Sequence, residues 1–221
     1  VSEDNLNEEY RAEFLVQMGE MLARFDKELD ARRAQPPTDD LLSRMVHSEA
    51  MGNMEAMERI ANIALLIVGG NDTTRNSMSA LVEAFDSYPD QLDALRADPA
   101  LIPNAAQEII RWQSPVTHMR RTALEDTELG GQQIKAGEKV VMWYISGNRD
   151  DEVIENPDAF IVDRARPRQH ISFGFGIHRC VGNRLAEMQL KILWEEILKR
   201  FAHIQVLGEP VRVRSSFVRG Y

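Results

Sequence analysis

A stretch without apolar periodicity, residues 148–179, separates parts of the chain that have the pattern of helices. It contains Pro157, Pro167, Gly174 and Gly176, which interrupt regular structure. Irregular segments of this length are uncommon inside a compact domain and usually carry function. The chain is therefore expected to form helices around a long loop that bears its functional site.

Most of the remaining sequence is predicted to be helical. In the first segment, apolar residues recur at spacings of three and four, as on one face of an amphipathic helix. Pro36 and Pro37 end this pattern, and residues 38–40 offer an N-cap for a short helix that ends at Val46. The helix of the first segment is expected over residues 7–33. Further helices are expected over residues 53–87, 90–97, 101–112 and 181–201.

Strand character is confined to short segments. Residues 119–122 and 139–145 have it. Gly130-Gly131 and Ala136-Gly137 predict hairpin turns between these two segments. Short strands are also expected in the tail, residues 204–221. The predicted fold class is mainly α with small β sheets.

The overall composition excludes several classes of protein. The chain has 221 residues, with 26 Lys and Arg against 35 Asp and Glu, and this net charge of −9 argues against a nucleic-acid partner. One cysteine excludes an intrachain disulfide. The longest apolar run, Ile63–Val68, is far too short for a membrane span. Residues 1–4 do not have the pattern of a signal peptide, so we expect a cytoplasmic protein.

A glycine-rich run from Phe173 to Gly182 brings the single cysteine, Cys180, to the start of a helix. Glycines allow the backbone to approach a bulky flat group, and the amides at a helix N-terminus favour a thiolate over a thiol. Two other interpretations stay open here. One is a buried structural cysteine, and the other is a catalytic thiol with His178 as its base.

This run resembles the haem-binding loop of the cytochrome P-450 family, whose pattern is Phe-x-x-Gly-x-His/Arg-x-Cys-x-Gly. Phe173, Gly176, His178, Cys180 and Gly182 match it. The resemblance implies a haem b cofactor with Cys180 as the thiolate ligand of its iron. It also implies that His178 approaches a haem propionate and that Phe173 packs near the sulfur.

Two further motifs contain arginines. Glu108 and Arg111 lie at i and i+3 on one helical face, a spacing that by itself is typical of a surface ion pair. The pair also resembles the Glu-x-x-Arg motif of the family, which is buried and gains a third partner; Arg164 matches that partner. Arg121 begins a segment that resembles Arg-x-Ala-x-Glu-Asp, whose arginine meets a haem propionate; solvent exposure is the alternative.

A glycine pair, Gly69 and Gly70, is predicted to interrupt the longest helix at a cost of about 1 kcal/mol each relative to Ala. Close helix packing is one explanation. The resemblance implies another, in which the glycines open a bulge over the haem. Asp72 and Thr73 then match the acid–alcohol pair that relays protons while oxygen is activated.

Residues 65–77 and 178–190 resemble the bacterial alkane-hydroxylase branch of the family. The resemblance implies hydroxylation of terminal methyl groups of medium-chain alkanes or fatty acids, with dioxygen and with electrons from a ferredoxin and its reductase. The substrate pocket is expected to be mostly apolar, and its candidate residues are Leu66, Ile67, Val116, Thr117, Met119 and Phe217.

Five arginines and two histidines occur between Arg164 and Arg184, with no acidic residue. We interpret this run as a docking surface for an acidic ferredoxin, since complementary charge raises the rate of encounter.

The resemblance covers residues 1–221, about half of the length of a family member. We therefore expect a single partial domain that lacks the N-terminal half of a haem-thiolate monooxygenase. A peroxide-driven haem-thiolate enzyme and a haem-free fragment without catalysis are the alternatives.

Overall fold

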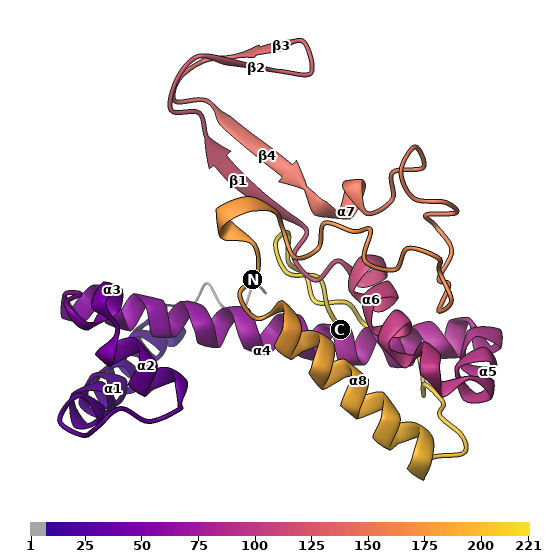
Figure 1. Cartoon of the computed structure of the whole chain (residues 1–221), viewed down its shortest axis with the longest axis horizontal. Helices are drawn as coiled ribbons and strands as arrows, with labels where there is room; N and C mark the ends of the chain where they lie inside the picture. Colours follow the sequence, from indigo (N-terminus) through magenta and orange to yellow (C-terminus); the bar gives the residue numbers. More distant parts are fainter. Residues whose placement is uncertain (1–7) are drawn as a thin grey trace. The chain divides into compact units, whose positions relative to one another are not determined.

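The computed structural model describes residues 8–221, and helices dominate it (Figure 1). The helices are α1 (Glu8–Arg33), α2 (Leu41–His47), α3 (Glu49–Gly52), α4 (Ala56–Ser87), α5 (Pro89–Ala97), α6 (Ile102–Gln113), α7 (Tyr144–Gly147) and α8 (Asn183–Arg200). Within residues 8–221, the regular structure also includes two 3-10 helices, η2 (Pro99–Leu101) and η3 (Gly176–His178), and four strands. The strands are β1 (His118–Thr122), β2 (Thr127–Leu129), β3 (Gln132–Ile134) and β4 (Lys139–Trp143). The predicted fold class, mainly α with small β sheets, is confirmed.

The chain divides into two compact units, which meet in sequence between Gly69 and Gly70 within α4. The core of the first unit joins α1, α2 and the first part of α4, and it consists of Leu29, Met45, Val46 and Ile63. As predicted, a residue of the 38–40 segment caps α2: the Asp40 side chain accepts a 2.9 Å hydrogen bond from the Ser43 amide. No helix within residues 8–221 has the length and apolarity that a membrane span requires.

The core of the second unit gathers side chains from α4, α5, α6 and α8. Phe85 lies at its centre, with its ring edge-on to Trp194 of α8 at 4.7 Å and to Phe160 at 5.7 Å. Phe160 belongs to the irregular segment that precedes η3, and it is only 2% exposed. Burial of this ring therefore anchors the irregular segment to the helical core.

The two small sheets are antiparallel ribbons. β1 pairs with β4, in a register that places His118 opposite Trp143, and β2 pairs with β3 beyond the far end of that ribbon (Figure 1). Gly130 and Gly131 connect β2 to β3 with φ of 58° and 78°, a left-handed conformation that favours glycine. The turn was predicted from these glycines, but the strands on either side of it were not.

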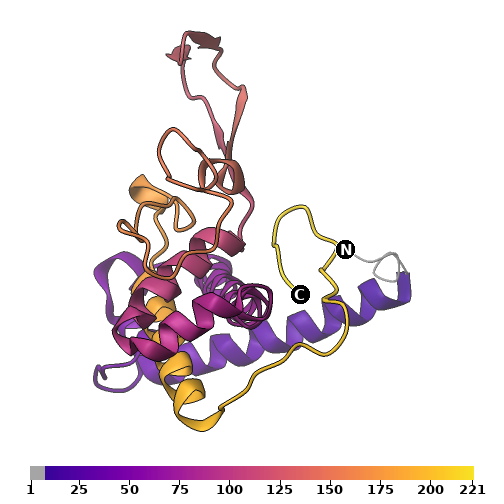
Figure 2. The same ribbon diagram turned by 90° about the vertical axis from the view of Figure 1, so that its right-hand side faces the viewer.

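Several expected elements differ from the structure. The helix expected over residues 53–87 is observed as α4. It runs without a break through Gly69 and Gly70, so the interruption predicted at these glycines is wrong. The other turns of this 32-residue helix compensate for the low helix propensity of two glycines. The expected strands of the tail are also wrong. Residues 204–221 are all described, and they form an extended irregular segment (Figure 2) whose only ladder contact is a bridge between Val116 and Val218.

A buried ion cluster joins α6 to the irregular segment. It consists of Glu108, Arg111 and Arg164, and we refer to it as the charged cluster. Glu108 and Arg111 are 0% exposed, and two parallel bonds of 2.8 Å connect the guanidinium of Arg111 to both oxygens of the Glu108 carboxylate. Arg164 approaches the same carboxylate through bonds of 2.9 and 3.1 Å. The structure thus brings the predicted ion pair of Glu108 and Arg111 together with its expected third partner, Arg164.

The two arginines carry more positive charge than one carboxylate can balance. Backbone carbonyls take up the remaining donors: Arg111 donates to the carbonyls of Asn148, Pro157 and Ala159. Arg164 likewise donates to carbonyls in the 155–159 stretch. The irregular segment lacks helix or strand partners for these carbonyls, so the charged cluster supplies the hydrogen bonds that regular structure would otherwise provide.

We predict that Glu108→Gln, which keeps the shape of the side chain but removes its charge, lowers the free energy of unfolding by about 3–5 kcal/mol, since it leaves two buried arginines without a counter-charge. Urea unfolding measures this loss. The matched control is Glu196→Gln. It breaks an exposed pair with Lys199, at the same i, i+3 spacing, and a second exposed pair with Arg200, and it should change stability little. Equal losses in the two variants would contradict the role assigned to the charged cluster.

Candidate functional site

The run from Phe173 to Gly182, which we refer to as the cysteine loop, closes on itself. The amide of Cys180 donates a 2.8 Å hydrogen bond to the carbonyl of Phe173. η3 lies between these two residues, and Gly182 is the N-cap of α8. Cys180 is a free cysteine and it is exposed, which contradicts the interpretation of a buried structural cysteine.

Two glycines of the cysteine loop have left-handed backbone conformations, with φ of 68° at Gly174 and 74° at Gly176. A Cβ at Gly174 would also lie 3.1 Å from the hydroxyl of Tyr144. A Cβ at Gly176 or Gly182 would meet no atom within 4 Å, so both face open space. Gly176 is thus required for its backbone conformation, whereas Gly174 is required for conformation and for space.

Three apolar side chains near Cys180 in the sequence are strongly exposed, next to the exposed polar residues His178 and Arg179. Phe175 is 86% exposed, Ile177 97% and Val181 86%. Soluble domains rarely expose large apolar patches unless a ligand or partner covers them. A thiol ligand, apolar side chains and glycines that leave open space fit a large, flat, apolar group that carries a metal. The residues present therefore fit the expected haem.

The two residues predicted to meet haem propionates are both exposed. Arg121 lies on β1, where its guanidinium donates to the carbonyl of Arg120 at 3.1 Å. His178 is the last residue of η3, two positions before Cys180. Each can present a donor to a carboxylate from outside the protein surface.

The predicted oxygen-side residues lie on α4. Gly69 and Gly70 are exposed. A Cβ at either position would meet no atom within 4 Å other than those of the adjoining turns of α4. Asp72 is half exposed and accepts a 3.0 Å ion-pair contact from Arg75. The carbonyl of the next residue, Thr73, accepts a 2.8 Å bond from the hydroxyl of Ser77.

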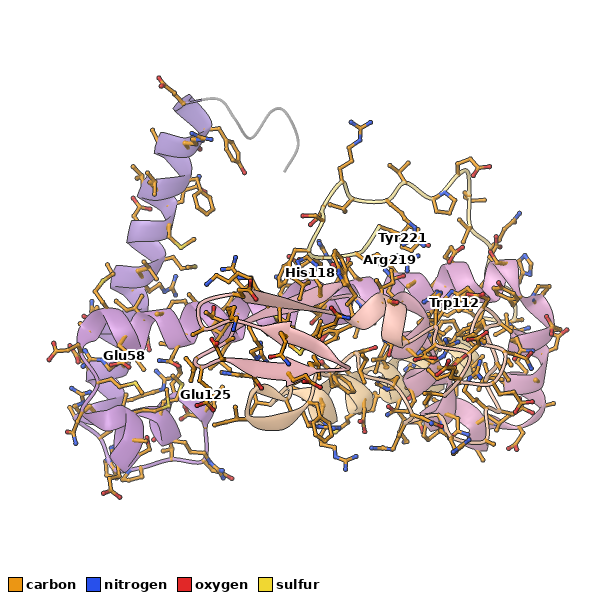
Figure 3. All side chains as sticks on the ribbon, turned by 90° about the horizontal axis from the view of Figure 1, so that it is seen from above. Glu58, Trp112, His118, Glu125, Arg219 and Tyr221 are labelled. Atoms are coloured by element: carbon orange, nitrogen blue, oxygen red, sulfur yellow. The ribbon has the colours of Figure 1, made fainter. Side chains whose placement is uncertain are left out.

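Four of the six predicted pocket residues come together in the second unit. Thr117 donates its amide to the carbonyl of Phe217 at 3.0 Å, next to the bridge formed by Val116, and Met119 follows on β1. Figure 3 shows His118 beside the segment that carries Arg219 and Tyr221. Met119 and Phe217 remain 37% and 42% exposed.

The other two pocket candidates, Leu66 and Ile67, lie on the part of α4 that belongs to the first unit. Leu66 packs against the core of that unit, whereas Ile67 is exposed.

The arginine run from Arg164 to Arg184 is not a uniform surface. Arg164 is buried in the charged cluster, and Arg168 and Arg184 both pair with Glu187, at 2.9 and 3.1 Å. The acidic partner lies three residues beyond the run, so the local sequence hid it. Of the arginines predicted to dock a ferredoxin, Arg166 and Arg179 are exposed and form no ion pair within residues 8–221.

His170 is a residue of the site that the sequence analysis missed. It accepts a 3.3 Å hydrogen bond from the Ser172 amide at Nδ1, and its Nε2 lies 3.1 Å from the side-chain oxygen of Gln107. This pairing places the proton on Nε2 and makes the ring neutral. Burial, followed by the positive charge of Arg111, lowers the pKa of His170 to about 4.

Asn148 was missed as well. It is completely buried and bonds to Ser114, Ile171 and Ser172. A polar residue at the start of a segment rich in turns is expected to be exposed. The one available signal was its position as the first residue of that segment, and this position does not distinguish a buried amide from an exposed one.

We predict that acid destabilises the protein through His170. The ring is neutral when folded and protonates near pH 6.5 when unfolded, so its contribution is complete above pH 6.5 and is lost as the pH falls towards 4. Besides Arg111, the charges that act on the ring are Glu108, Glu187 and Arg179. Urea unfolding at pH 7 and pH 4 should show that the wild type loses about 3 kcal/mol more than His170→Gln, which cannot titrate. Parallel losses in the two proteins would contradict the prediction.

Comparison with known proteins places these features in a family. The model of the family described as cytochrome P-450 matches residues 100–215, which include the charged cluster and the cysteine loop. Linalool 8-monooxygenase from Pseudomonas putida is 44% identical over 204 residues, which cover 92% of this chain and 50% of that protein. Steroid C26-monooxygenase from Mycolicibacterium smegmatis is 40% identical over 199 residues, which cover 89% of this chain and 49% of that protein.

A solved structure of a cytochrome P-450 is also similar to this chain. Cytochrome P-450-153 from Novosphingobium aromaticivorans matches with a TM-score of 0.90 and 55% identity, over 97% of this chain and 53% of that chain. The chain spans about half the length of the curated relatives that it matches. Because the family model covers more than half of the 221 residues, the chain belongs to the cytochrome P-450 family.

Proposed function

We propose that the protein to which this chain belongs is a haem-thiolate monooxygenase, with Cys180 as the ligand of the haem iron. The observation that carries the proposal is an exposed, free thiol on a glycine-bearing loop, surrounded by exposed apolar side chains. Family membership and the monooxygenase names of the two curated relatives support it.

The cofactor that the family implies is haem, and we propose haem b. Cys180 would bind its iron, while Phe175, Ile177 and Val181 would cover its apolar surface. Arg121 and His178 would bind its propionates. Haem with a thiolate ligand supplies the activation of dioxygen, in which one oxygen atom enters a C–H bond and the other leaves as water after two electrons and two protons are added.

Asp72 and Thr73 are proposed to deliver those protons. A carboxylate next to a hydroxyl on one helix can hold a proton and pass it along a short path. The ion pair between Asp72 and Arg75 is half exposed, so it costs little to open. Asp72 would therefore exchange protons with solvent, and Thr73, the next residue of α4, would act after it in the proposed delivery.

We propose that the substrate is a small apolar molecule hydroxylated at a terminal methyl group, such as a medium-chain alkane or a fatty acid. Val116, Thr117, Met119 and Phe217 would form one wall of its pocket, and their partial exposure leaves apolar surface for such a ligand. Linalool, which the name of one relative specifies, is the competing substrate class. Binding titrations that follow the spin state of the iron would rank alkanes, fatty acids and linalool.

The electrons are proposed to come from a ferredoxin and its reductase in the cytoplasm. Arg166 precedes the cysteine loop and Arg179 lies within it. Both are exposed, and they would attract an acidic donor. Arg168 and Arg184 would contribute less, because Glu187 already balances part of their charge. Loss of ferredoxin-driven turnover with retained peroxide-driven turnover would instead favour a peroxide-driven enzyme.

We predict that the reduced, haem-loaded protein binds carbon monoxide with the strongly red-shifted Soret band of a thiolate ligand. Cys180→His should retain haem but lose that band, since an imidazole replaces the sulfur. The difference spectrum of the reduced protein with and without carbon monoxide measures both. An unchanged band in the variant would exclude Cys180 as the ligand, and a wild type that takes up no haem would favour a fragment without catalysis.

A further inference from the structure

The side chain of Asn148 uses all its hydrogen-bonding groups inside the protein. Its Nδ2 donates to the hydroxyl oxygens of Ser114 at 2.8 Å and Ser172 at 2.7 Å. Its Oδ1 accepts from the amide of Ile171 at 2.8 Å. Asn148 is 0% exposed, so protein groups and not solvent satisfy its side-chain amide.

The orientation of this amide is determined by its neighbours. The hydroxyl of Ser114 donates to the carbonyl of Arg111 at 2.8 Å, and that of Ser172 donates to the carbonyl of Ile110 at 2.7 Å. A hydroxyl has one hydrogen, so each serine can only accept from residue 148. An aspartate has the same shape as asparagine, but it could not supply the two donors.

The backbone of Asn148 connects the same residue to the charged cluster. Its carbonyl accepts a 2.8 Å bond from Arg111, and its amide donates to the carbonyl of Tyr144 at 2.9 Å. Asn148 therefore lies between the buried arginine on one side and residues 171–172 on the other.

Residues 171–172 immediately precede the cysteine loop. The next residue, Phe173, accepts the amide of Cys180 at its carbonyl, 2.8 Å away. A continuous series of hydrogen bonds and one peptide step thus leads from Arg111 through Asn148 and Ser172 to the backbone of Cys180. His170 also fixes the position of Ser172, because its Nδ1 accepts a hydrogen bond from the Ser172 amide.

We propose that Asn148 is a positioning residue that sets the place of the Cys180 sulfur relative to the helical scaffold. The inference rests on the proposed function, because it concerns how the sulfur binds iron. Asn148 touches neither haem nor substrate in this account. It acts through Ile171 and Ser172, which fix where the cysteine loop begins.

The two serines provide a matched pair of variants. Each accepts one bond from Asn148 and donates one bond to a carbonyl of α6. Ser114→Ala and Ser172→Ala therefore remove the same kinds of contact. Only Ser172, however, belongs to the segment that immediately precedes the cysteine loop. A purely structural role for Asn148 would make the two variants alike.

The experiment follows the thiolate-type Soret band of the reduced, carbon monoxide-bound holoprotein over time, together with the haem reduction potential and urea unfolding. We expect Ser172→Ala and Asn148→Asp to lose the band about tenfold faster than the wild type and to shift the potential. Ser114→Ala should lose a similar amount of stability to Ser172→Ala but keep the band and the potential of the wild type.

The inference is overturned if Ser172→Ala keeps the thiolate band and potential of the wild type, or if Ser114→Ala changes them as much as Ser172→Ala does. The serine pair decides the question even where Asn148→Asp does not fold. A wild-type holoprotein without the thiolate band would overturn the proposed function and this inference together, whereas a normal wild type with equal serine variants overturns this inference alone.

Discussion

A carboxylate without access to water needs compensating charge, and Glu108 receives it from two arginines that lie 3 and 56 residues away in the sequence. The same arginines donate to carbonyls of the irregular segment, which has few backbone partners of its own. The charged cluster and the carbonyls of the irregular segment depend on each other. Without the carbonyls, the two arginines would lack partners for their remaining donors, and without the arginines, half-buried carbonyls would lack donors. The irregular segment keeps its shape because the charged cluster holds it, and the cysteine loop follows directly from that segment.

Local patterns predicted the helices well because apolar spacing and capping are properties of neighbouring residues. α1, α5, α6 and α8 begin and end within one or two residues of the positions expected, and Asp40 caps α2. Partners distant in sequence were harder to predict. The pairing of Glu108 with Arg164 was expected only from resemblance to a family, and the burial of Asn148 and His170 was not expected at all. His170 has one local partner, the amide of Ser172. Its other partner, Gln107, belongs to α6, and the side-chain partners of Asn148 lie more than twenty residues away, so no local pattern contains them.

The two sides of the cysteine loop have opposite chemistry. Towards the protein, the loop begins at a network of buried polar groups in which Asn148, Ser172 and His170 are all bonded. Towards the outside, it exposes Phe175, Ile177 and Val181 around the thiol. Buried polar networks define one conformation when every member is paired, whereas exposed apolar side chains favour whatever covers them. This combination would fix the backbone position of Cys180 and leave the apolar side chains around it available to the proposed haem. The pairs of Arg168 and Arg184 with Glu187 balance part of the positive charge next to the cysteine loop.

The central claim is that the sulfur of Cys180 binds the iron of a haem. X-ray absorption at the iron edge of the haem-loaded protein tests it most directly, because sulfur and nitrogen ligands scatter differently. We expect one sulfur among the atoms that coordinate the iron, in addition to the four nitrogens of the porphyrin. A shell made only of nitrogen and oxygen would contradict it.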